Sequence, residues 1–194
     1  MEKGLEQLKK HLFTMQPLSD EEWQDFAGIW QLHQYKRKAT LTAAGETERY
    51  LYFVLEGIQR AFFLDAEREA TLVFTYPYCF SGIADSLLTQ LPSRYFLETL
   101  TASTLLRTTH TQLQQLMEKH RNIEKLINRF TSFALMGLLE RHVELLTYNA
   151  EEKFRTLLKR SPHVLQLIPH KYLASYIGMD ATTFSKLMAT VRIE

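Results

Sequence analysis

The hydrophobic pattern of this chain changes once, near residue 110, and that change is the strongest limit on its fold. Between about Gln31 and Thr109, short or alternating apolar runs are separated by Gly, Pro and Asp residues. The runs are rich in aromatic and β-branched residues and cover 50–55, 58–64, 70–76, 95–100 and 104–106. Short strands punctuated by turn residues predict an antiparallel sandwich or barrel. From Thr111 onward the pattern is helical, so we expect an α+β chain with its strands before its main helices.

Two local signals mark the ends of expected elements. The run from Ser19 to Glu22 has the spacing of a capping box, so a short helix that carries Trp23 and Phe26 into the core should begin there. Glu56 and Gly57 separate two apolar runs with almost no loop between them. Gly57 is therefore expected to supply a positive φ in a tight turn.

The segment from about Asn122 to Leu146 predicts a long helix with two apolar faces. The first face carries Ile123, Leu126, Ile127, Phe130, Ala134, Leu138 and Leu145, and the second carries Phe133, Leu135, Met136, Leu139, Val143 and Leu146. Such a helix must be covered on two sides, which favours a homodimer in which one side packs on the β domain and the other on a second copy. A wholly intramolecular burial by the C-terminal helices is the alternative. The pattern leaves open which face meets the partner, and the candidate dimer contacts are Ile127, Phe130, Ala134 and Leu138.

The last segment has the spacing of two short helices. Pro169 is placed to open the first helix and Gly178 to end it, and the small Ala174 allows the helices to approach closely. Asp180 then caps a second helix over 181–191. The inner face of that helix should carry Phe184, Leu187, Met188 and Val191. This spacing is typical of a helix-turn-helix, whose second helix enters the major groove of DNA, and an αα-hairpin used only for packing is the alternative.

Charge is distributed unevenly along the chain, although the formal net charge is only +1. Residues 153–194 contain seven Lys or Arg and two acidic residues, which makes this segment +5 and leaves −4 for the remainder. Such a basic end suggests a polyanionic partner, since neutralising phosphates releases condensed counterions. A merely solvated helical surface accounts for the charge equally well.

Several classes of protein are disfavoured by what the sequence lacks. No apolar run approaches the ~20 residues that span a bilayer, and residues 1–12 contain no apolar signal-peptide core. The single cysteine, Cys79, allows neither an internal disulfide nor a Cys-rich zinc site, so we expect a cytoplasmic protein without membrane association. Walker and Gly-x-Ser-x-Gly motifs are absent, and the seven His are too scattered for a cupin-type metal enzyme. We therefore expect no catalytic residue, no metal site and no enzyme activity.

Three stretches carry a resemblance that covers essentially the whole chain. They are residues 52–60, residues 80–88 followed by 92–95, and residues 168–179. Together they resemble the cyclic-AMP receptor protein/Fnr (Crp/Fnr) family of bacterial transcription regulators. The resemblance implies an N-terminal antiparallel β-roll (a double-stranded β-helix or jelly roll), a long central dimerisation helix and a C-terminal helix-turn-helix. It also implies a cyclic-nucleotide-binding-like sensor domain over 1–120, the dimerisation helix over 121–148 and the DNA-binding domain over 149–194.

Within this resemblance, residues 80–88 and 92–95 are similar to the family's phosphate-binding cassette. The implied ligand-binding residues are Phe80, Ser81, Gly82, Ile83, Ala84, Arg94 and Tyr95. Members that bind cyclic AMP have a glutamate in place of Ile83 and a small hydroxyl residue in place of Tyr95, and they carry hydroxyl groups on the central helix, which here is apolar around Gly137. We therefore expect a degenerate pocket that does not bind cyclic AMP in the usual way. Backbone N–H groups near Gly82, with Arg94 as a positive fork, would suit a small anionic or nucleotide-like effector, and no other cofactor is expected.

The resemblance also implies double-stranded DNA as a partner, with RNA polymerase as a further contact. Thr182 and Lys186 are the expected base readers on the second helix, which Ala181 opens, and the expected phosphate contacts are Lys171, Thr183, Ser185 and Arg192. Ala181 and Thr182 replace the Arg-Glu pair that is common in the family. The sequence ends at Glu194, where a β-wing often follows, so we expect a winged-helix-like domain without its wing. These departures keep open an alternative, a ligand-binding or interaction module of the same fold that has lost specific DNA binding.

Overall fold

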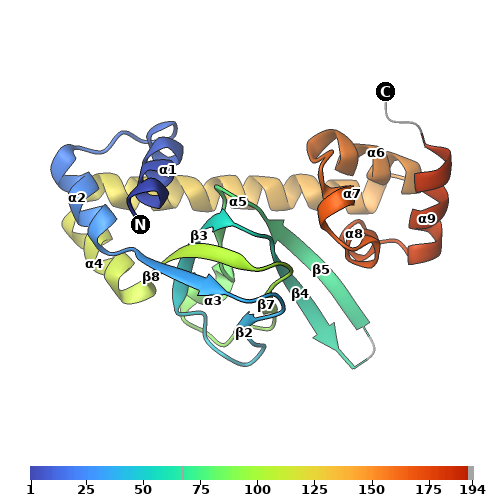
Figure 1. Cartoon of the computed structure of the whole chain (residues 1–194), viewed down its shortest axis with the longest axis horizontal. Coiled ribbons are helices and arrows are strands. Elements are labelled where there is room, and N and C mark those ends of the chain that lie inside the picture. Colours follow the sequence, from blue (N-terminus) through green and yellow to red (C-terminus); the bar gives the residue numbers. More distant parts are fainter. Residues whose placement is uncertain (67, 192–194) are drawn as a thin grey trace. The chain divides into compact units, whose positions relative to one another are not determined.

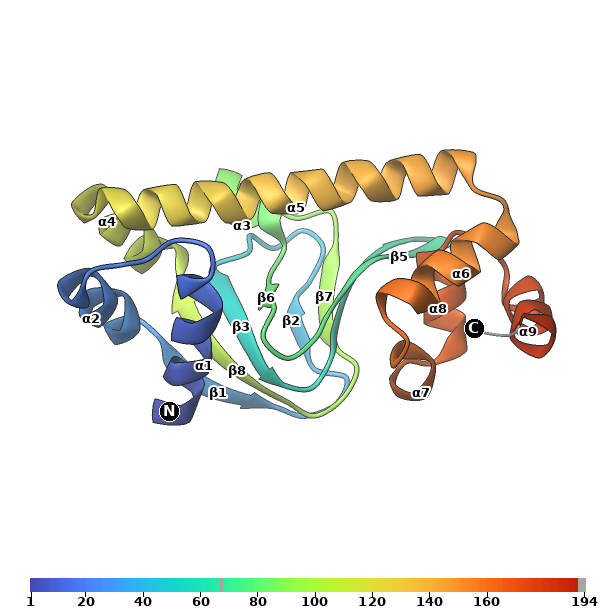
Figure 2. The same cartoon turned by 90° about the horizontal axis from the view of Figure 1, so that it is seen from above.

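The structure, a computed structural model, describes residues 1–66 and 68–191 (Figures 1 and 2). Its internal contacts separate into two compact units. The N-terminal unit comprises Met1–Phe62 and Val73–Ser132, and the C-terminal unit comprises Phe63–Leu72 and the chain from Phe133 onward. The long helix α5 (Arg121–Thr147) contributes to both units.

Two four-stranded sheets form the centre of the N-terminal unit, with the strand orders β1-β8-β3-β6 and β2-β7-β4-β5. The pairs β1–β8, β3–β8, β3–β6, β2–β7 and β4–β7 are antiparallel. The strands span Gln31–Tyr35 (β1), Thr40–Thr42 (β2), Tyr50–Glu56 (β3), Gln59–Asp65 (β4), Arg68–Thr75 (β5), Phe80–Ser81 (β6), Phe96–Thr99 (β7) and Ser103–Thr109 (β8). The prediction of antiparallel β structure from the short apolar runs is thus confirmed.

Side chains alternate across each strand, so the first sheet has two different faces. Tyr52, Val54 and Leu105 point toward the second sheet and pack in one cluster with Ala61 and Leu97. This cluster fills the space between the two sheets.

The opposite face of the first sheet carries Phe53, Phe80 and Leu106 and is covered by helices. These helices are α1 (Glu2–Phe13), α2 (Asp20–Gly28), α4 (His110–Lys119) and the beginning of α5, which lie together in Figure 2. Their buried apolar side chains are Leu8, Leu12, Phe26, Leu113, Leu116, Ile123, Leu126 and Ile127. The apolar side chains in the first half of α5 therefore pack within the N-terminal unit.

Both local signals are confirmed. The Ser19 hydroxyl accepts the Glu22 backbone N–H at 3.2 Å, and the Glu22 carboxylate accepts the Ser19 N–H at 2.8 Å. Gly57 has φ +90°, and a Cβ there would lie only 2.5 Å from the carbonyl oxygen of Ala102. Glycine is therefore required at this turn for its left-handed conformation and also for its lack of a side chain.

The C-terminal unit consists mainly of helices, as the sequence pattern predicts. They are α6 (Ala150–Arg160), α7 (Val164–Leu167), α8 (His170–Tyr176) and α9 (Ala181–Thr190), together with the second part of α5. Phe154 and Phe184 form the centre of the core, with ring centroids 5.3 Å apart. In the parts of the chain that the structure describes, no helix is long and apolar enough to cross a membrane.

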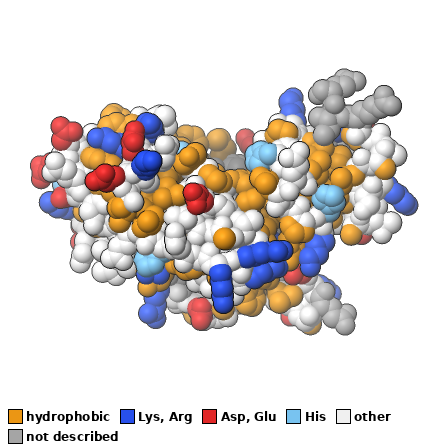
Figure 3. Space-filling model, viewed as in Figure 1, with side chains coloured by type: hydrophobic (Ala, Val, Ile, Leu, Met, Phe, Trp, Pro, Cys, Tyr) orange, Lys and Arg blue, Asp and Glu red, His pale blue; other side chains and the backbone are white. Residues whose placement is uncertain are grey.

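Helix α2 is attached to the junction of α4 and α5 by a small charged cluster. The Asp25 carboxylate lies 2.6 Å from Lys119 Nζ and 2.7 Å from His120 Nε2. The hydrogen bonds from Lys119 and His120 lower the pKa of the Asp25 carboxyl. On the surface of α1 and α2, acidic and basic side chains are mixed (Figure 3), so this region presents no strong potential of one sign.

We expect Asp25→Asn to destabilise the N-terminal unit in a pH-dependent way. A carboxyl whose pKa is lowered by folding stabilises the folded state above its unfolded pKa, about 3.9, and loses that contribution as the pH falls through the folded pKa. The difference in thermal midpoint between wild type and Asp25→Asn should thus be present at pH 7 and disappear as the pH falls through the lowered folded pKa of Asp25. Glu118→Gln, at an exposed position on α4, is the control. A difference that persists unchanged into strong acid would contradict the charged link.

Candidate effector pocket and nucleic-acid interface

The predicted cassette is a tight strand-to-helix turn in the N-terminal unit. Strand β6 is followed by Gly82, with φ +143°, and α3 (Ala84–Thr89) begins directly after Ile83. A Cβ on Gly82 would lie 3.3 Å from the carbonyl oxygen of Tyr50, so the turn approaches strand β3 closely. The cassette backbone therefore packs directly against strand β3.

The side chains at the start of the cassette face inward and already have protein partners. Ile83 is only 3% exposed and packs in the cluster between the sheets, and Tyr95 packs against the same cluster. Ser81 is also buried, and its hydroxyl accepts a hydrogen bond from Thr75 Oγ1 at 3.0 Å. These groups fill the inside of the turn.

The other predicted ligand-binding side chains lie elsewhere. The Phe80 ring packs on the helix-covered face, with its centroid 5.3 Å from that of Phe53 and 4.6 Å from that of Phe130. Phe80 is thus a core residue rather than a ligand contact, because alternation along β6 turns it away from Ser81. Arg94 and Ala84 are exposed. The seven residues therefore do not converge on one cavity.

Glu48, which the sequence reasoning missed, lies directly at the cassette. Its side chain is buried, with 1% of the residue exposed. The carboxylate accepts hydrogen bonds from the backbone N–H of Ile83 at 3.3 Å, the backbone N–H of Tyr50 at 3.1 Å and the Thr42 hydroxyl at 2.7 Å. Burial raises the pKa of this carboxyl, and the hydrogen bonds partly offset that effect. The backbone donor at the start of α3 is thus already taken by a carboxylate of the same chain.

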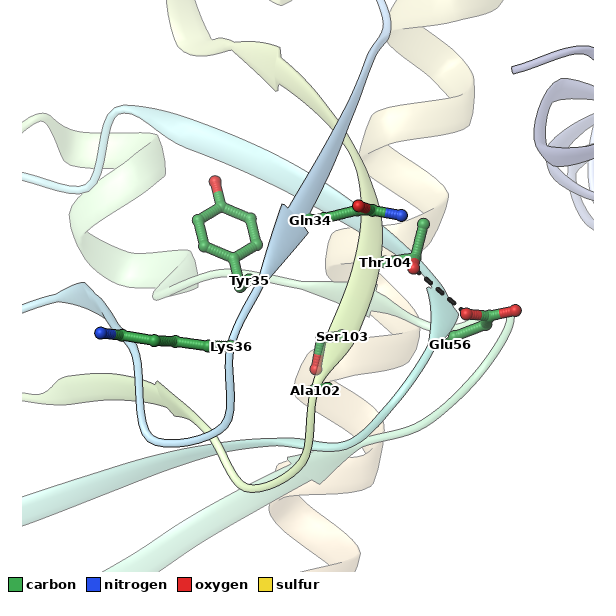
Figure 4. Close-up of a pocket in the computed structure, with 7 residues that line it drawn as sticks. All are labelled: Gln34, Tyr35, Lys36, Glu56, Ala102, Ser103 and Thr104. Carbon is green, nitrogen blue, oxygen red and sulfur yellow. Dashed lines mark hydrogen bonds between the residues drawn. The ribbon is translucent and has the colours of Figure 1, made fainter.

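Two open hollows lie on the surface of the N-terminal unit. One, of about 390 Å³, lies at the end of β1. Figure 4 shows that Tyr35 and Lys36 extend to one side of it and Gln34 and Glu56 to the other, so its side chains do not converge on a ligand. The other, of about 510 Å³, is lined by Leu41, Thr42 and Gly45–Tyr50, which include Glu48. Within the described ranges, no group of three or more His, Cys, Asp or Glu side chains could hold a metal ion.

In the C-terminal unit, α8 and α9 are joined by a tight turn. Gly178 has φ +64°, and the Met179 N–H donates to the carbonyl oxygen of Ala174 at 3.0 Å. Asp180 caps α9 by accepting the Thr183 backbone N–H at 2.8 Å, and hydrogen bonds from Thr183 lower the pKa of this carboxyl. Ala174 is 1% exposed, as expected for a small residue where two helices approach.

The outer face of α9 is open to solvent. The predicted DNA-contacting residues that are exposed are Lys171, Ala181, Thr182, Ser185 and Lys186. Thr183 is half-buried, and its hydroxyl donates to the Asp180 carboxylate at 2.7 Å, so its donor is used within the helix cap. Arg192 lies outside the described residues. Exposed Thr182, Ser185 and Lys186 thus form one polar outer row, since residues three and four apart share a helix face.

Helix α8 is held by a charged network at the end of α5. Glu144 is 6% exposed and pairs with Arg141 at 3.2 Å and with Arg160 at 2.5 Å. Arg141 also donates to the backbone carbonyl oxygen of Tyr176, at the end of α8, and its guanidinium lies 4.0 Å from the centroid of that ring. The buried carboxylate therefore joins α5, α6 and α8.

The part of strand β5 that belongs to this unit also contacts α8. The Ser175 hydroxyl accepts the Thr71 backbone N–H at 2.9 Å and donates to the Glu69 carbonyl oxygen at 3.3 Å. A side chain of α8 thus pairs with the backbone of strand β5.

The structure corrects part of the predicted dimer surface. Ile127 is 7% exposed within its own unit, and Phe130 packs on Phe80. Both residues therefore belong to the intramolecular face of α5; Ile127 is not available to a partner, and Phe130 is half-buried. Ala134 and Leu138 are exposed, as they must be for a partner contact.

The second part of α5 has apolar side chains on its surface. All residues from 131 to 140 are exposed. The most regular exposed row consists of Met136, Leu139, Val143 and Leu146, with 51%, 60%, 54% and 71% exposure. We call this row the 136–146 stripe. Its spacing of three and four residues is that of a coiled-coil seam.

One family model matches part of the chain, and solved structures match most of it. Residues 32–120 match the family model of the cyclic nucleotide-binding domain. No curated protein matches the chain.

Several solved structures have the same architecture. FixK2 from Bradyrhizobium japonicum has a TM-score of 0.74 at 15% identity, and the match covers 83% of each chain. A protein described as a transcriptional regulator of the Crp/Fnr family from Eubacterium rectale has a TM-score of 0.70 at 12% identity, with 89% of this chain and 82% of that chain covered. The catabolite activator protein of Thermus thermophilus has a TM-score of 0.58 at 19% identity, with 95% and 90% covered. At such low identities the likeness establishes the fold alone.

Proposed function

This chain carries a cyclic nucleotide-binding domain and has the fold of the Crp/Fnr regulators, and on that premise we propose that it is a homodimeric, DNA-binding transcription regulator rather than an enzyme. The two sheets of the N-terminal unit would form the jelly-roll sensor. Helices α8 and α9 would form the helix-turn-helix, with α9 as the recognition helix in the major groove.

The observation that carries this proposal is the arrangement of α8 and α9. The inner side of α9 is anchored by Phe184, which is fully buried, while Thr182, Ser185 and Lys186 remain exposed. The left-handed Gly178 and the Asp180 cap set the angle between the two helices through a short turn. A helix anchored on one side and polar on the other suits insertion into a groove.

The exposed part of α5 supports the dimer. On a regular helix the 136–146 stripe lies roughly 100–180° away from Ile127, which faces the core of its own unit. Two copies that pair these stripes would bury apolar side chains that are otherwise in water. Two α9 helices related by a two-fold axis would then read a near-palindromic site.

The function is tested by enriching double-stranded fragments from a random or genomic pool with the full chain, followed by mobility shifts on the enriched sequence. We expect a near-palindromic sequence bound much more tightly than unrelated DNA. A second candidate is an interaction module without specific DNA binding, which is favoured by Lys186 being the sole cation within residues 181–191. Recovery of no sequence preference would support that candidate and overturn the regulator.

Lys186→Ala is expected to weaken binding to the enriched site by about 1–3 kcal/mol and to relax the preference at one base pair of each half-site. Lys186 is exposed on the outer row of α9, where an amine can reach a guanine edge. Lys159→Ala, at an exposed position of α6, is the matched control and should retain the sequence preference. Unchanged affinity and preference in Lys186→Ala would show that Lys186 is not the reader.

A further inference from the structure

We propose that the carboxylate of Glu48 is a built-in anion of the cassette, which occupies the backbone donor that a phosphate would use and closes the wild-type roll to anionic effectors at that point. The inference rests on the proposed sensor role of the roll. Nothing in it requires DNA binding.

The hydrogen bonds of the carboxylate are those expected of a bound anion. One oxygen accepts from the Ile83 N–H and from the Thr42 hydroxyl, and the other accepts from the Tyr50 N–H. No Lys, Arg or His of the described ranges lies within 4.0 Å of this carboxylate, so its charge is balanced by backbone and hydroxyl dipoles. Oriented N–H groups at a turn also bind phosphate oxygens in anion-binding loops.

The backbone of Glu48 is fastened to the cassette helix as well. Its N–H donates to the Ser86 hydroxyl at 2.9 Å, and its carbonyl oxygen accepts from Gln90 Nε2 at 3.2 Å. The Ser86 hydroxyl in turn donates to the Leu91 carbonyl oxygen at 2.6 Å. The main chain of Glu48 is thus held by α3 and the residue after it, and its carboxylate is held by Ile83, Thr42 and Tyr50.

An external anion at this position would meet two obstacles. The Ile83 N–H is already used, and a second negative charge would lie against a buried carboxylate. The side chain of Ile83 and the ring of Tyr95 pack in the adjoining interior, and Arg94 is exposed. The Glu48 carboxylate therefore takes the place of an effector and acts as a specificity-determining group that rejects phosphate-bearing ligands.

The direct test is binding of inorganic phosphate and of cyclic AMP to the full chain, measured by calorimetry. Wild type should bind neither at millimolar concentration. Glu48→Ala vacates the donors and should bind phosphate at least tenfold more tightly than wild type. Glu46→Ala removes the same charge two residues away, where the side chain is exposed, and should gain nothing. Binding of either probe by wild type, or no gain by a folded Glu48→Ala protein, would overturn the inference.

A second measurement does not depend on the folding of a variant. In the wild-type protein, the amide proton of Ile83 should titrate together with the Glu48 carboxyl in NMR spectra recorded as a function of pH. The midpoint should lie above about 4.3, the ordinary value for glutamate, because burial raises the pKa of this carboxyl. An Ile83 amide that does not respond to that titration would show that the carboxylate does not occupy the donor. Neither experiment uses DNA, so a failure here leaves the regulator proposal untouched.

Discussion

Replacing Leu139 with glutamate is expected to make the protein monomeric at micromolar concentrations, where we propose that the wild type is a dimer. Leu139 lies at the middle of the 136–146 stripe and is 60% exposed in the single chain. Burying one leucine contributes about 2 kcal/mol, and a two-fold axis repeats the position, so its loss removes about 4 kcal/mol. That corresponds to roughly a thousandfold weaker dimer, before the cost of burying two facing carboxylates. Sedimentation or light scattering measures the effect, and binding to a palindromic site should fall with it.

Two further substitutions make the assignment of the stripe specific. Leu91→Glu introduces the same charge at a leucine that is 64% exposed in the N-terminal unit, and it should leave the dimer intact. Leu138→Glu probes the neighbouring side of α5, which points in the same direction as Ile127 on a regular helix, and its effect should be clearly smaller. A dimer that survives Leu139→Glu but dissociates with Leu138→Glu would place the interface on the other side. A wild-type protein that is monomeric in the same measurement would contradict the proposed dimer.

Replacing Glu144 with alanine is expected to lower the free energy of unfolding of the C-terminal unit by about 3–5 kcal/mol, the range for removing one partner of a buried ion pair. The loss comes mainly from Arg141, whose side chain is 11% exposed and would keep its charge without a carboxylate. Arg160 is about half exposed, so water can replace its partner. Because the network also joins α5 to α8, the angle of α9, the proposed recognition helix, should become less defined, and binding to the proposed DNA site should weaken.

Urea unfolding, with hydrogen exchange of amides in α6 and α9 as the local readout, measures this effect. Glu140→Ala makes the same change at an exposed glutamate one turn earlier on α5, and it should alter the stability by less than about 0.5 kcal/mol. A loss below about 1 kcal/mol in Glu144→Ala would mean that the buried pair is solvated and does not hold the helices together.

Features that depend on a few neighbouring residues could be predicted from the sequence. The capping box at Ser19 needs only the side chain three residues later, and Gly57 and Gly178 need only a backbone conformation that other residues resist. The order of strands and helices followed from the change in hydrophobic period near residue 110. These local rules, together with the three stretches that resemble the Crp/Fnr regulators, predict the architecture from the sequence alone.

The tertiary structure alone decided which part of α5 is buried within its own unit and which part is exposed. Periodicity shows that a face must be buried, but it does not say against what. Ile127 and Phe130 looked equivalent to Ala134 and Leu138 in the sequence, yet the first pair packs on α1, α2 and Phe80 while the second pair is exposed.

The same limit applies to the cassette. Nothing in the sequence distinguishes Glu48 from Glu46, since both are glutamates in one polar loop. In the structure Glu46 is exposed, whereas Glu48 is buried. Glu48 forms hydrogen bonds with Ile83 and Ser86, which lie 35 and 38 residues away. Local patterns determined the elements of this protein and their ends, because helix caps and turns are made by adjacent residues. The position of the Glu48 carboxylate at the cassette and the exposed face of the long helix were decided by contacts between residues far apart in the chain, and such contacts produce no periodic pattern in the sequence.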